Sequence, residues 1–318
     1  MSSKVYQIVT DRILEELDKG IIPWKKTWHC DGSLPMNLIS KKEYRGTNLV
    51  LLPTCYNSPF FLTFKQAKKL GGSVRKGEKS HLVIFWKFFD KIDNDGEKVG
   101  SVPMLRYYNV FNVEQCENIN PAKIPAMAFD DQPEIEPIEF AEQIIQDMPL
   151  RPEIKHNEAR AYYSPSLDYV NMPKRNLWDG KSDNYYSTLF HELVHSTGHE
   201  KRCKRGIEEN AGFGSVSYSK EELIAEMGSA FLCSITGILN DDILKNSASY
   251  IDGWKRRIRE DNKLVVTASG KAQKAVDFIL NKKFDDTNKE TKTEYKTESN
   301  MKPVVVPVAK EAQLSLFV

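Results

Sequence analysis

The sequence lacks any apolar run long enough to cross a membrane. A membrane-spanning helix needs about 18 or more consecutive apolar residues, and no stretch of the 318 residues provides them. The opening stretch MSSKVYQIVTDRILEELDKG also lacks the long apolar segment of a secretory signal peptide, because acidic residues interrupt it. Its apolar residues instead follow a helical period that ends at Gly20. We therefore expect no membrane segment and a cytoplasmic protein.

Cysteine is scarce as well. The five cysteines are odd in number and scattered, and no two of them form a CxxC pair. This pattern argues against the disulfide framework of a secreted protein. It predicts reduced thiols, which agrees with a cytoplasmic location.

Histidine is nearly as rare, yet two of the six histidines stand four residues apart in the stretch HELVH, residues 191–195. At this histidine content an HExxH sequence arises by chance in roughly one such chain per hundred. On a helix, His191 and His195 lie on one face and can bind the same ion. Glu192 is then placed to take a proton from a metal-bound water, whose pKa zinc lowers towards about 7. The motif predicts a zinc peptidase site with one Zn²⁺ per chain and Glu192 as the catalytic base.

Several residues are candidates for the third protein ligand. In metzincins a histidine stands three positions after the glycine of HExxHxxG, but here that position is Lys201. His199 is near, although Gly198 is expected to end or distort the helix. The stretch ELIAE supplies Glu222 and Glu226 from a later helix, and a resemblance to Glu-ligand zinc peptidases, whose second helix often reads ExxAE, favours Glu222. Glu226 would then accept the free N–H of a ligand histidine. Glu226 and His199 stay open as alternative ligands.

The pattern of elements predicts an α+β protein with two domains. Residues 1–118 combine helical segments with short aromatic and β-branched runs, such as HLVIFWKFF and LRYYNVFNV, that are typical of a small sheet. Residues 119–136 are rich in proline and acid and read as a linker. Strand-like pieces followed by long helices predict a second α+β domain over residues 137–282. By analogy with zincins, the strand-like DYVNMP before the motif is expected to align an extended peptide substrate. Residues 283–318 begin polar and charged, and we expect a disordered tail.

The first domain contains a strongly basic segment. Residues 41–87 hold ten basic side chains and two acidic ones, a net charge of +8 in a chain whose total is +1. Such a density attracts phosphate backbones, and interleaved aromatic residues can stack on unpaired bases. The alternative is that the aromatic residues form the core of a small sheet and the charges a solvated face. The candidate contacts for single-stranded DNA are Tyr44, Arg45, Lys65, Lys68, Arg75, Lys76 and Lys79.

Three segments together resemble the ArdC antirestriction family of plasmids and mobile elements. They are LPMNLISKKEYRGTNLVLL, FLTFKQAKKLGGSVRKGEKSHLVIFWK and the region from FHELVHSTGHEKR to YSKEELIAEMGSAFL. The likeness covers roughly residues 4–282. It implies an N-terminal single-stranded-DNA-binding domain joined to a zincin-like metallopeptidase domain, and protection of incoming DNA from restriction during conjugation. It does not identify the protein substrate of the peptidase.

The chain finishes with AKEAQLSLFV, outside that likeness. The stretch Gln313–Phe317 resembles the QL[SD]LF peptide by which bacterial proteins bind the replicative sliding clamp. Gln313 would supply a polar anchor, and Leu314, Leu316 and Phe317 would enter an apolar pocket. Short disordered segments bind with modest affinity because ordering them offsets part of the contact energy. The alternative is an apolar strand that packs on the body of the protein.

Three functions are compatible with these features. The first is an antirestriction protein that binds single-stranded DNA and cuts an unknown protein substrate through its zinc site. The second is a DNA-coating protein whose metal site is structural or vestigial. The third is a DNA-dependent protease tethered to the replication clamp.

Overall fold

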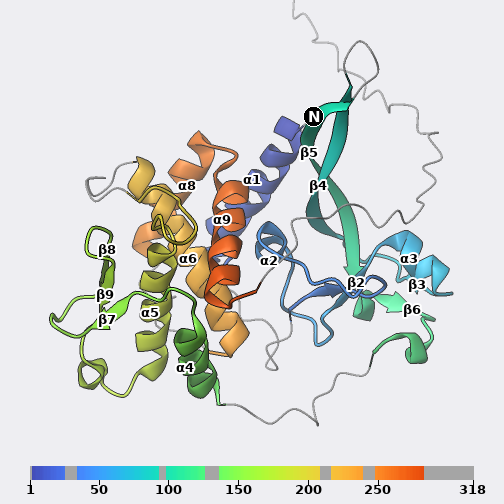
Figure 1. Ribbon diagram of the computed structural model, residues 1–318. Helices are drawn as coiled ribbons and strands as arrows, with labels where there is room; N and C mark the ends of the chain where they lie inside the picture. Colours follow the sequence, from blue (N-terminus) through green and yellow to red (C-terminus); the bar gives the residue numbers. More distant parts are fainter. Residues whose placement is uncertain are drawn as a thin grey trace, which may run out of the picture. The chain divides into compact units, whose positions relative to one another are not determined.

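The computed structural model describes residues 2–25, 34–92, 98–125, 136–207, 216–238 and 248–282 (Figure 1). Helix α1 (Ser2–Asp18) opens the chain and turns Val9, Ile13 and Leu17 to the core, where each is at most 1 % exposed. Gly20 follows with φ of 78°, a left-handed conformation that glycine adopts without strain. The helix expected from apolar periodicity, and its end at Gly20, are confirmed.

The N-terminal region contains a four-stranded sheet of order β1-β2-β5-β4 and a two-stranded sheet of β3 and β6. Strand β2 pairs in parallel with β1 and antiparallel with β5. Thr63 caps helix α3 through a capping box with Gln66, so the turn after β2 has its backbone donors satisfied. The elements are β1 (Met36–Asn37), α2 (Thr47–Leu51), β2 (Phe60–Leu62), α3 (Phe64–Lys69), β3 (Ser73–Val74), β4 (His81–Ile92), β5 (Lys98–Asn112) and β6 (Cys116–Glu117).

Strands β4 and β5 form one long antiparallel hairpin of twelve and fifteen residues. Near the base of the hairpin, Val83 and Leu105 are fully buried in the core. Farther along, both strands keep aromatic residues but lose their cover, and Trp86 and Phe88 are 47 % and 61 % exposed. The runs HLVIFWKFF and LRYYNVFNV are therefore strands, as expected, but only their inner ends belong to the core.

The C-terminal region places helices beside a small sheet of order β7-β9-β8. Helix α5 packs against α6, and α6 packs against α9 (Figure 1). The elements are α4 (Pro137–Asp147), β7 (Glu153–Lys155), β8 (Tyr162–Ser164), β9 (Tyr169–Asn171), α5 (Ser182–Ser196), α6 (Val216–Thr236), α8 (Ala248–Glu260) and α9 (Leu264–Ile279), with a 3-10 turn, η3, at Arg175–Trp178.

One hydrophobic core runs through both regions. It includes Val9 and Leu105 from the N-terminal region and Leu193 and Ala272 from the C-terminal region. Residues 1–283 accordingly form one compact unit. Polar contacts reinforce the junction, since the Thr47 and Ser269 hydroxyls lie 2.7 Å apart. The α+β class and the two-region order are confirmed, but the regions share their core.

Parts of the predicted organisation lie outside the described residues. This holds for residues 126–135 of the predicted linker and for the whole tail with its Gln313–Phe317 peptide. Within the described ranges, no helix is both long and apolar enough to cross a bilayer.

Candidate metal centre

Helix α5 turns both histidines of HELVH to one side. The Nε2 atoms of His191 and His195 lie 3.0 Å apart, and the ring centroids are 4.7 Å apart. The side chains are 22 % and 13 % exposed, so both remain accessible at the surface of the helix pair. The spacing of four residues, close to one helical turn, explains why the rings converge.

Helix α6 brings Glu222 to the two histidines. Its Oε2 lies 3.5 Å from Nε2 of His191, and its Oε1 lies 3.4 Å from Nε2 of His195. Two ligand atoms about 2.1 Å from a tetrahedral ion are roughly 3.4 Å apart. The three side chains, whose ligand atoms all lie within 4.8 Å of one another, therefore fit a single divalent ion. Two imidazoles and one carboxylate leave the fourth position of such an ion for water or substrate.

Close contact between α5 and α6 makes this meeting possible. A Cβ atom added at Gly228 would lie 2.8 Å from Cγ2 of Val194, so only glycine fits at this point. One residue further, the Ser229 hydroxyl donates to the Ser187 carbonyl at 2.8 Å. These contacts fix the register of the two helices and so decide which glutamate of α6 faces the histidines.

Glu221, which the sequence reasoning missed, lies behind His195. Its Oε1 is 3.5 Å from Nδ1 of His195, and Arg205 holds the carboxylate from the other side. Burial alone lowers the pKa of His195, but the carboxylates of Glu221 and Glu222 outweigh it and raise that pKa to about 10. Burial acts to raise the pKa of Glu222, yet hydrogen bonds from both histidines lower it well below its ordinary value.

The other two candidate ligands lie elsewhere. Glu226 pairs with Lys25 of the N-terminal region, with Nζ and Oε2 3.4 Å apart. The predicted role of Glu226, to accept a histidine N–H, therefore falls to Glu221, because Glu221 is the residue that faces Nδ1 of His195. Helix α5 ends at Ser196, and the turn that follows places Nδ1 of His199 4.0 Å from Asp168.

Glu192 is buried, with 8 % of its surface exposed. It lies close enough to His195 to contribute to the raised pKa of that ring. Its neighbours along the helix, His191 and Leu193, point to the metal group and to the core respectively. The carboxylate is therefore held beside the metal group, where a general base would have to be.

The strand DYVNMP does not lie where a substrate could pair with it. Strand β9 is the middle strand of its sheet and pairs with both β7 and β8. Its backbone groups are therefore already used, and the expectation that this strand aligns a peptide is wrong. Strand β8 is an edge of the sheet and also contacts α5. An extended chain can add to β8 instead.

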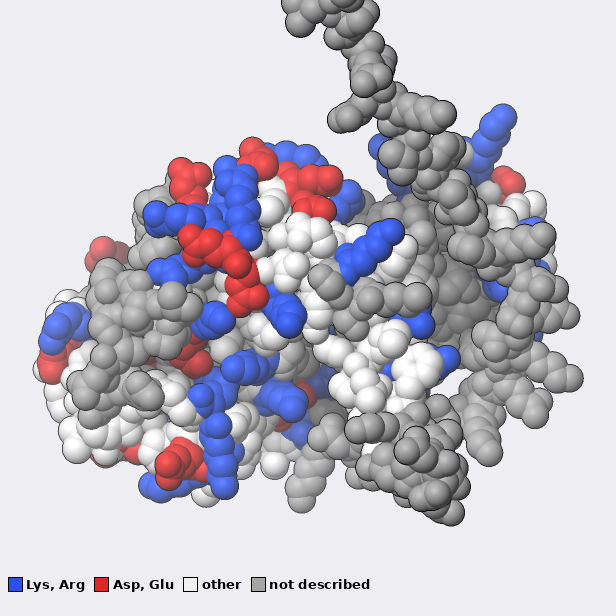
Figure 2. All heavy atoms as spheres, turned by 90° about the horizontal axis from the view of Figure 1, so that it is seen from above, with Lys and Arg blue, Asp and Glu red and all other residues white. Residues whose placement is uncertain are grey.

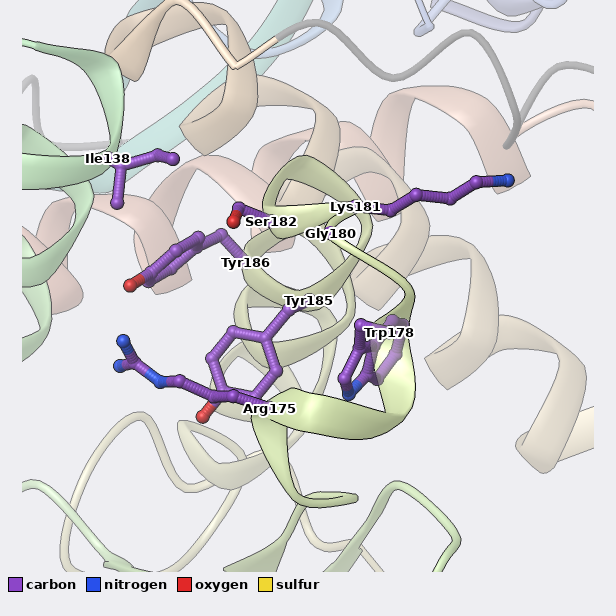
Figure 3. A pocket seen from close by; sticks show the side chains of 8 residues that line it. All are labelled: Ile138, Arg175, Trp178, Gly180, Lys181, Ser182, Tyr185 and Tyr186. Carbon is purple, nitrogen blue, oxygen red and sulfur yellow. The ribbon is translucent and has the colours of Figure 1, made fainter.

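A small cavity lies near the start of α5 and is separate from the metal group (Figure 3). It measures about 100 Å³ and is lined by Arg175, Trp178, Tyr185 and Tyr186, among others. Arg175 packs over the rings of both tyrosines, 5.0 and 5.5 Å from their centroids, and pairs with Glu142. At a rise of about 1.5 Å per residue, Ser182 and His191 are about 13 Å apart along the helix. The cavity is much smaller than a typical ligand pocket of about 300 Å³ or more.

The structure separates the candidate DNA contacts into two groups. Tyr44 is 6 % exposed and packs edge-on against Phe61 in the core. Arg45 pairs with Asp277 of α9. The expectation that these two side chains face DNA is wrong, because both hold the N-terminal region on the C-terminal one. The remaining candidates are exposed, namely Lys65, Lys68, Arg75, Lys76 and Lys79. Of these, Arg75 pairs with Glu78 at 2.8 Å.

The hairpin β4–β5 offers exposed rings that the sequence alone could not separate from core residues. Trp86, Phe88 and Tyr107 share one face, because directly opposite residues of an antiparallel pair point the same way. By contrast, the face of the molecule in Figure 2 mixes basic and acidic side chains without a field of one sign. Cations of the C-terminal region are often paired, such as Lys255 with Asp18 at 2.6 Å.

The helix pair, the small sheet and the two-histidine, one-glutamate group define a zincin-like metallopeptidase. The family model for zincin-like metallopeptidases matches residues 139–271, and the model for the N-terminal domain of anti-restriction factor ArdC matches residues 3–111. An uncharacterized Sinorhizobium fredii protein, y4eC, is 32 % identical over 303 residues, which cover 91 % of this chain and 95 % of that protein. The chain belongs to the ArdC antirestriction family.

Solved structures agree with this family. The metal-free crystal structure of antirestriction protein ArdC from the R388 plasmid is 34 % identical, with a TM-score of 0.67, and covers 87 % of this chain and 97 % of that one. The Mn(II)-bound structure gives 32 % and 0.65 over the same shares. The metal-bound relative and the ligand group here both support a divalent ion. Two Escherichia coli DNA primases TraC are 32 % and 33 % identical, but the chain spans only 27 % and 20 % of their lengths.

Proposed function

We propose that the protein is a metal-dependent peptidase that serves antirestriction. The observation that carries this is the convergence of His191, His195 and Glu222, with Glu192 buried beside them. A bound divalent ion would acidify a coordinated water and polarise a peptide carbonyl. Glu192 takes the proton of that water and passes it to the leaving amine.

The proposed ion is zinc, at one per chain. Two neutral imidazoles and one carboxylate match the donor set of catalytic zinc sites. The metal content of protein purified without added metal tests this, and a stoichiometric content of manganese instead of zinc would contradict it.

Two substitutions test the peptidase. Glu192→Gln should keep the metal and lower peptide hydrolysis by about 100-fold or more, the usual contribution of a general base. His191→Ala should lose the metal and the activity together. His199→Ala, beside Asp168, serves as the matched histidine control and should keep both. Hydrolysis that is unchanged in Glu192→Gln would rule out this mechanism.

We also propose that the N-terminal region binds single-stranded DNA. Lys65, Lys68, Lys76 and Lys79 are exposed, and exposed lysines attract phosphates. The hairpin adds rings on which bases can stack. Lys65→Glu with Lys68→Glu should weaken binding and flatten the dependence of the logarithm of affinity on that of salt by about 1 per lost phosphate contact. An unchanged affinity and slope would exclude these two lysines.

A DNA-coating role without catalysis is the second candidate, favoured by the same exposed lysines and rings. Survival of an unmodified plasmid against a restriction enzyme separates the two roles. If catalysis is needed, Glu192→Gln should abolish protection and retain DNA binding. If coating suffices, the lysine variant should abolish protection and Glu192→Gln should preserve it.

A further inference from the structure

Arg205 and Glu221 form a largely buried pair directly behind His195. The Arg205 side chain is 5 % exposed and that of Glu221 is 17 % exposed. Arg205 Nε donates to Glu221 Oε2 at 3.1 Å, and Nη2 donates to Oε1. Because the contact is bidentate, it fixes both the position and the plane of the carboxylate.

The same guanidinium is anchored to the end of helix α5. Arg205 Nη2 donates to the Val194 carbonyl at 2.7 Å, and Nη1 donates to the Thr197 hydroxyl at 2.6 Å. Val194 directly precedes His195 in the chain. Arg205 therefore ties the carboxylate from α6 to the backbone beside the histidine, and the two move as one unit.

The two nitrogens of His195 face two different carboxylates. Nε2 lies 3.4 Å from Glu222 and 3.0 Å from Nε2 of His191, inside the group of potential ligands. Nδ1 lies 3.5 Å from Glu221 on the opposite side of the ring. An imidazole that binds a metal through one nitrogen carries its proton on the other, and a carboxylate there fixes the ring and its tautomer.

We propose that Glu221, held by Arg205, is the positioning residue of the metal centre. It accepts the Nδ1 proton of His195 and so presents the lone pair of Nε2 to the ion. Adjacent residues of a helix point about 100° apart, so Glu222 can face the ion while Glu221 faces the back of the ring. Arg205 engages both oxygens of Glu221, which leaves Glu222 as the carboxylate offered to the ion. This inference rests on the metal site proposed above.

A merely structural role would be that Glu221 neutralises Arg205. The same loop contains a matched pair for comparison, because Arg202, with its side chain 1 % exposed, is bound by Asp168. That pair joins the turn after α5 to the β8–β9 turn and holds neither member of the metal group. Asp168→Asn therefore reproduces the loss of a buried arginine's partner without removing a contact to a ligand histidine.

The test is a zinc titration of the full chain against a competing chelator. Glu221→Ala should weaken zinc binding by about 10- to 100-fold, the usual effect of losing such a partner. Glu221→Gln should lose less, because its amide carbonyl still accepts the Nδ1 proton. Asp168→Asn should lower the melting temperature and leave zinc affinity within about twofold of wild type. In the zinc-loaded protein, the Nδ1 proton of His195 should be protected from solvent exchange in wild type and exposed in Glu221→Ala.

The outcomes distinguish the inference from the site on which it rests. Equal zinc affinity in wild type and Glu221→Ala would overturn the positioning role, and so would an equal loss in Asp168→Asn and Glu221→Ala. If wild type itself binds no more zinc than His191→Ala, the metal site fails instead. If Glu221→Ala does not fold, Glu221→Gln decides: a zinc affinity equal to that of wild type, with His195 Nδ1 exchanging freely in both proteins, overturns the proposal.

Discussion

Arg202 and Asp168 show how single side chains hold the turn that follows the metal-bearing helix. Arg202 donates to the Ser196 carbonyl at 2.7 Å, to the Leu150 carbonyl at 2.9 Å and to both oxygens of Asp168. A buried guanidinium without a carboxylate would be costly, so this pair matters more than the many exposed ion pairs.

We expect Asp168→Asn to lower the free energy of unfolding by about 3 kcal/mol, because Arg202 keeps its charge and loses its counterion. Urea denaturation measures this. Asp252→Asn is the control, since that side chain is 91 % exposed and its loss should change stability by less than about 0.5 kcal/mol. Equal effects of the two substitutions would contradict the assignment.

The same pair predicts a pH dependence. Burial acts to raise the pKa of Asp168, but hydrogen bonds from Arg202 and Tyr163 outweigh it and hold that pKa below the ordinary 3.8. A lowered folded-state pKa means that the contribution is complete above the unfolded pKa and is lost as pH falls through the folded one. The stability difference between wild type and Asp168→Asn should be constant from about pH 5 to 7 and shrink below about pH 4. A difference that grew in acid would refute this account.

At the scale of elements, the contact of α5 with α6 controls the metal group. Gly228→Ala should cost about 1–3 kcal/mol, the usual price of overpacking, because its Cβ would meet Val194 at 2.8 Å. It should also weaken metal binding, since the helices must separate. Gly270→Ala in α9 is the control, because nothing lies within 4 Å of its added Cβ, and it should leave metal binding intact. Thermal unfolding and zinc titration of both variants check this.

The hairpin is the second element with its own prediction. Residues 81–89 and 100–112 contain no acidic side chain, and Trp86 and Phe88 stand about 6.8 Å apart along β4. Trp86→Ala and Phe88→Ala should each weaken single-stranded DNA binding by about 1–3 kcal/mol, the worth of one stacked base. Leu177→Ala, in the C-terminal region and 58 % exposed, should have no effect. Fluorescence anisotropy with a labelled oligonucleotide measures the affinities, and unchanged affinities in both hairpin variants would remove these rings from the DNA surface.

At the scale of the whole molecule, the shared core links the two regions. Gly46 donates its N–H to Gln273 Oε1 at 2.8 Å, and Tyr44 and Leu193 belong to the same hydrophobic cluster. A fragment of residues 136–282 would expose the surface that α1 and α2 cover. We expect that fragment to be less stable than the full chain, as circular dichroism on heating would show. Point variants of the full chain therefore separate the functions more cleanly than isolated domains.

The tail carries a prediction that depends on sequence alone. Removing residues 313–317 should abolish capture of the bacterial sliding clamp in a pull-down, and removing residues 288–292 should not. Equal capture by the two deletions would eliminate the clamp-tethered function.

The sequence by itself determined what depends on short range. A spacing of four residues on one helix is enough to bring His191 and His195 together, and apolar periodicity is enough to define α1 and its buried face. The α+β class also followed from the order of strand-like and helical segments.

Only the tertiary structure decided which distant segments meet. Glu221, Glu222 and Glu226 lie on one helix, and the register set by Gly228 against Val194 brings Glu222 to the metal side of the histidines, Glu221 to the back of His195 and Glu226 to Lys25. Likewise, nothing local distinguishes the buried ring of Tyr44 from the exposed ring of Trp86. The physical reason is that periodicity fixes the direction of a side chain relative to its own element, whereas burial and partners depend on the element packed against it.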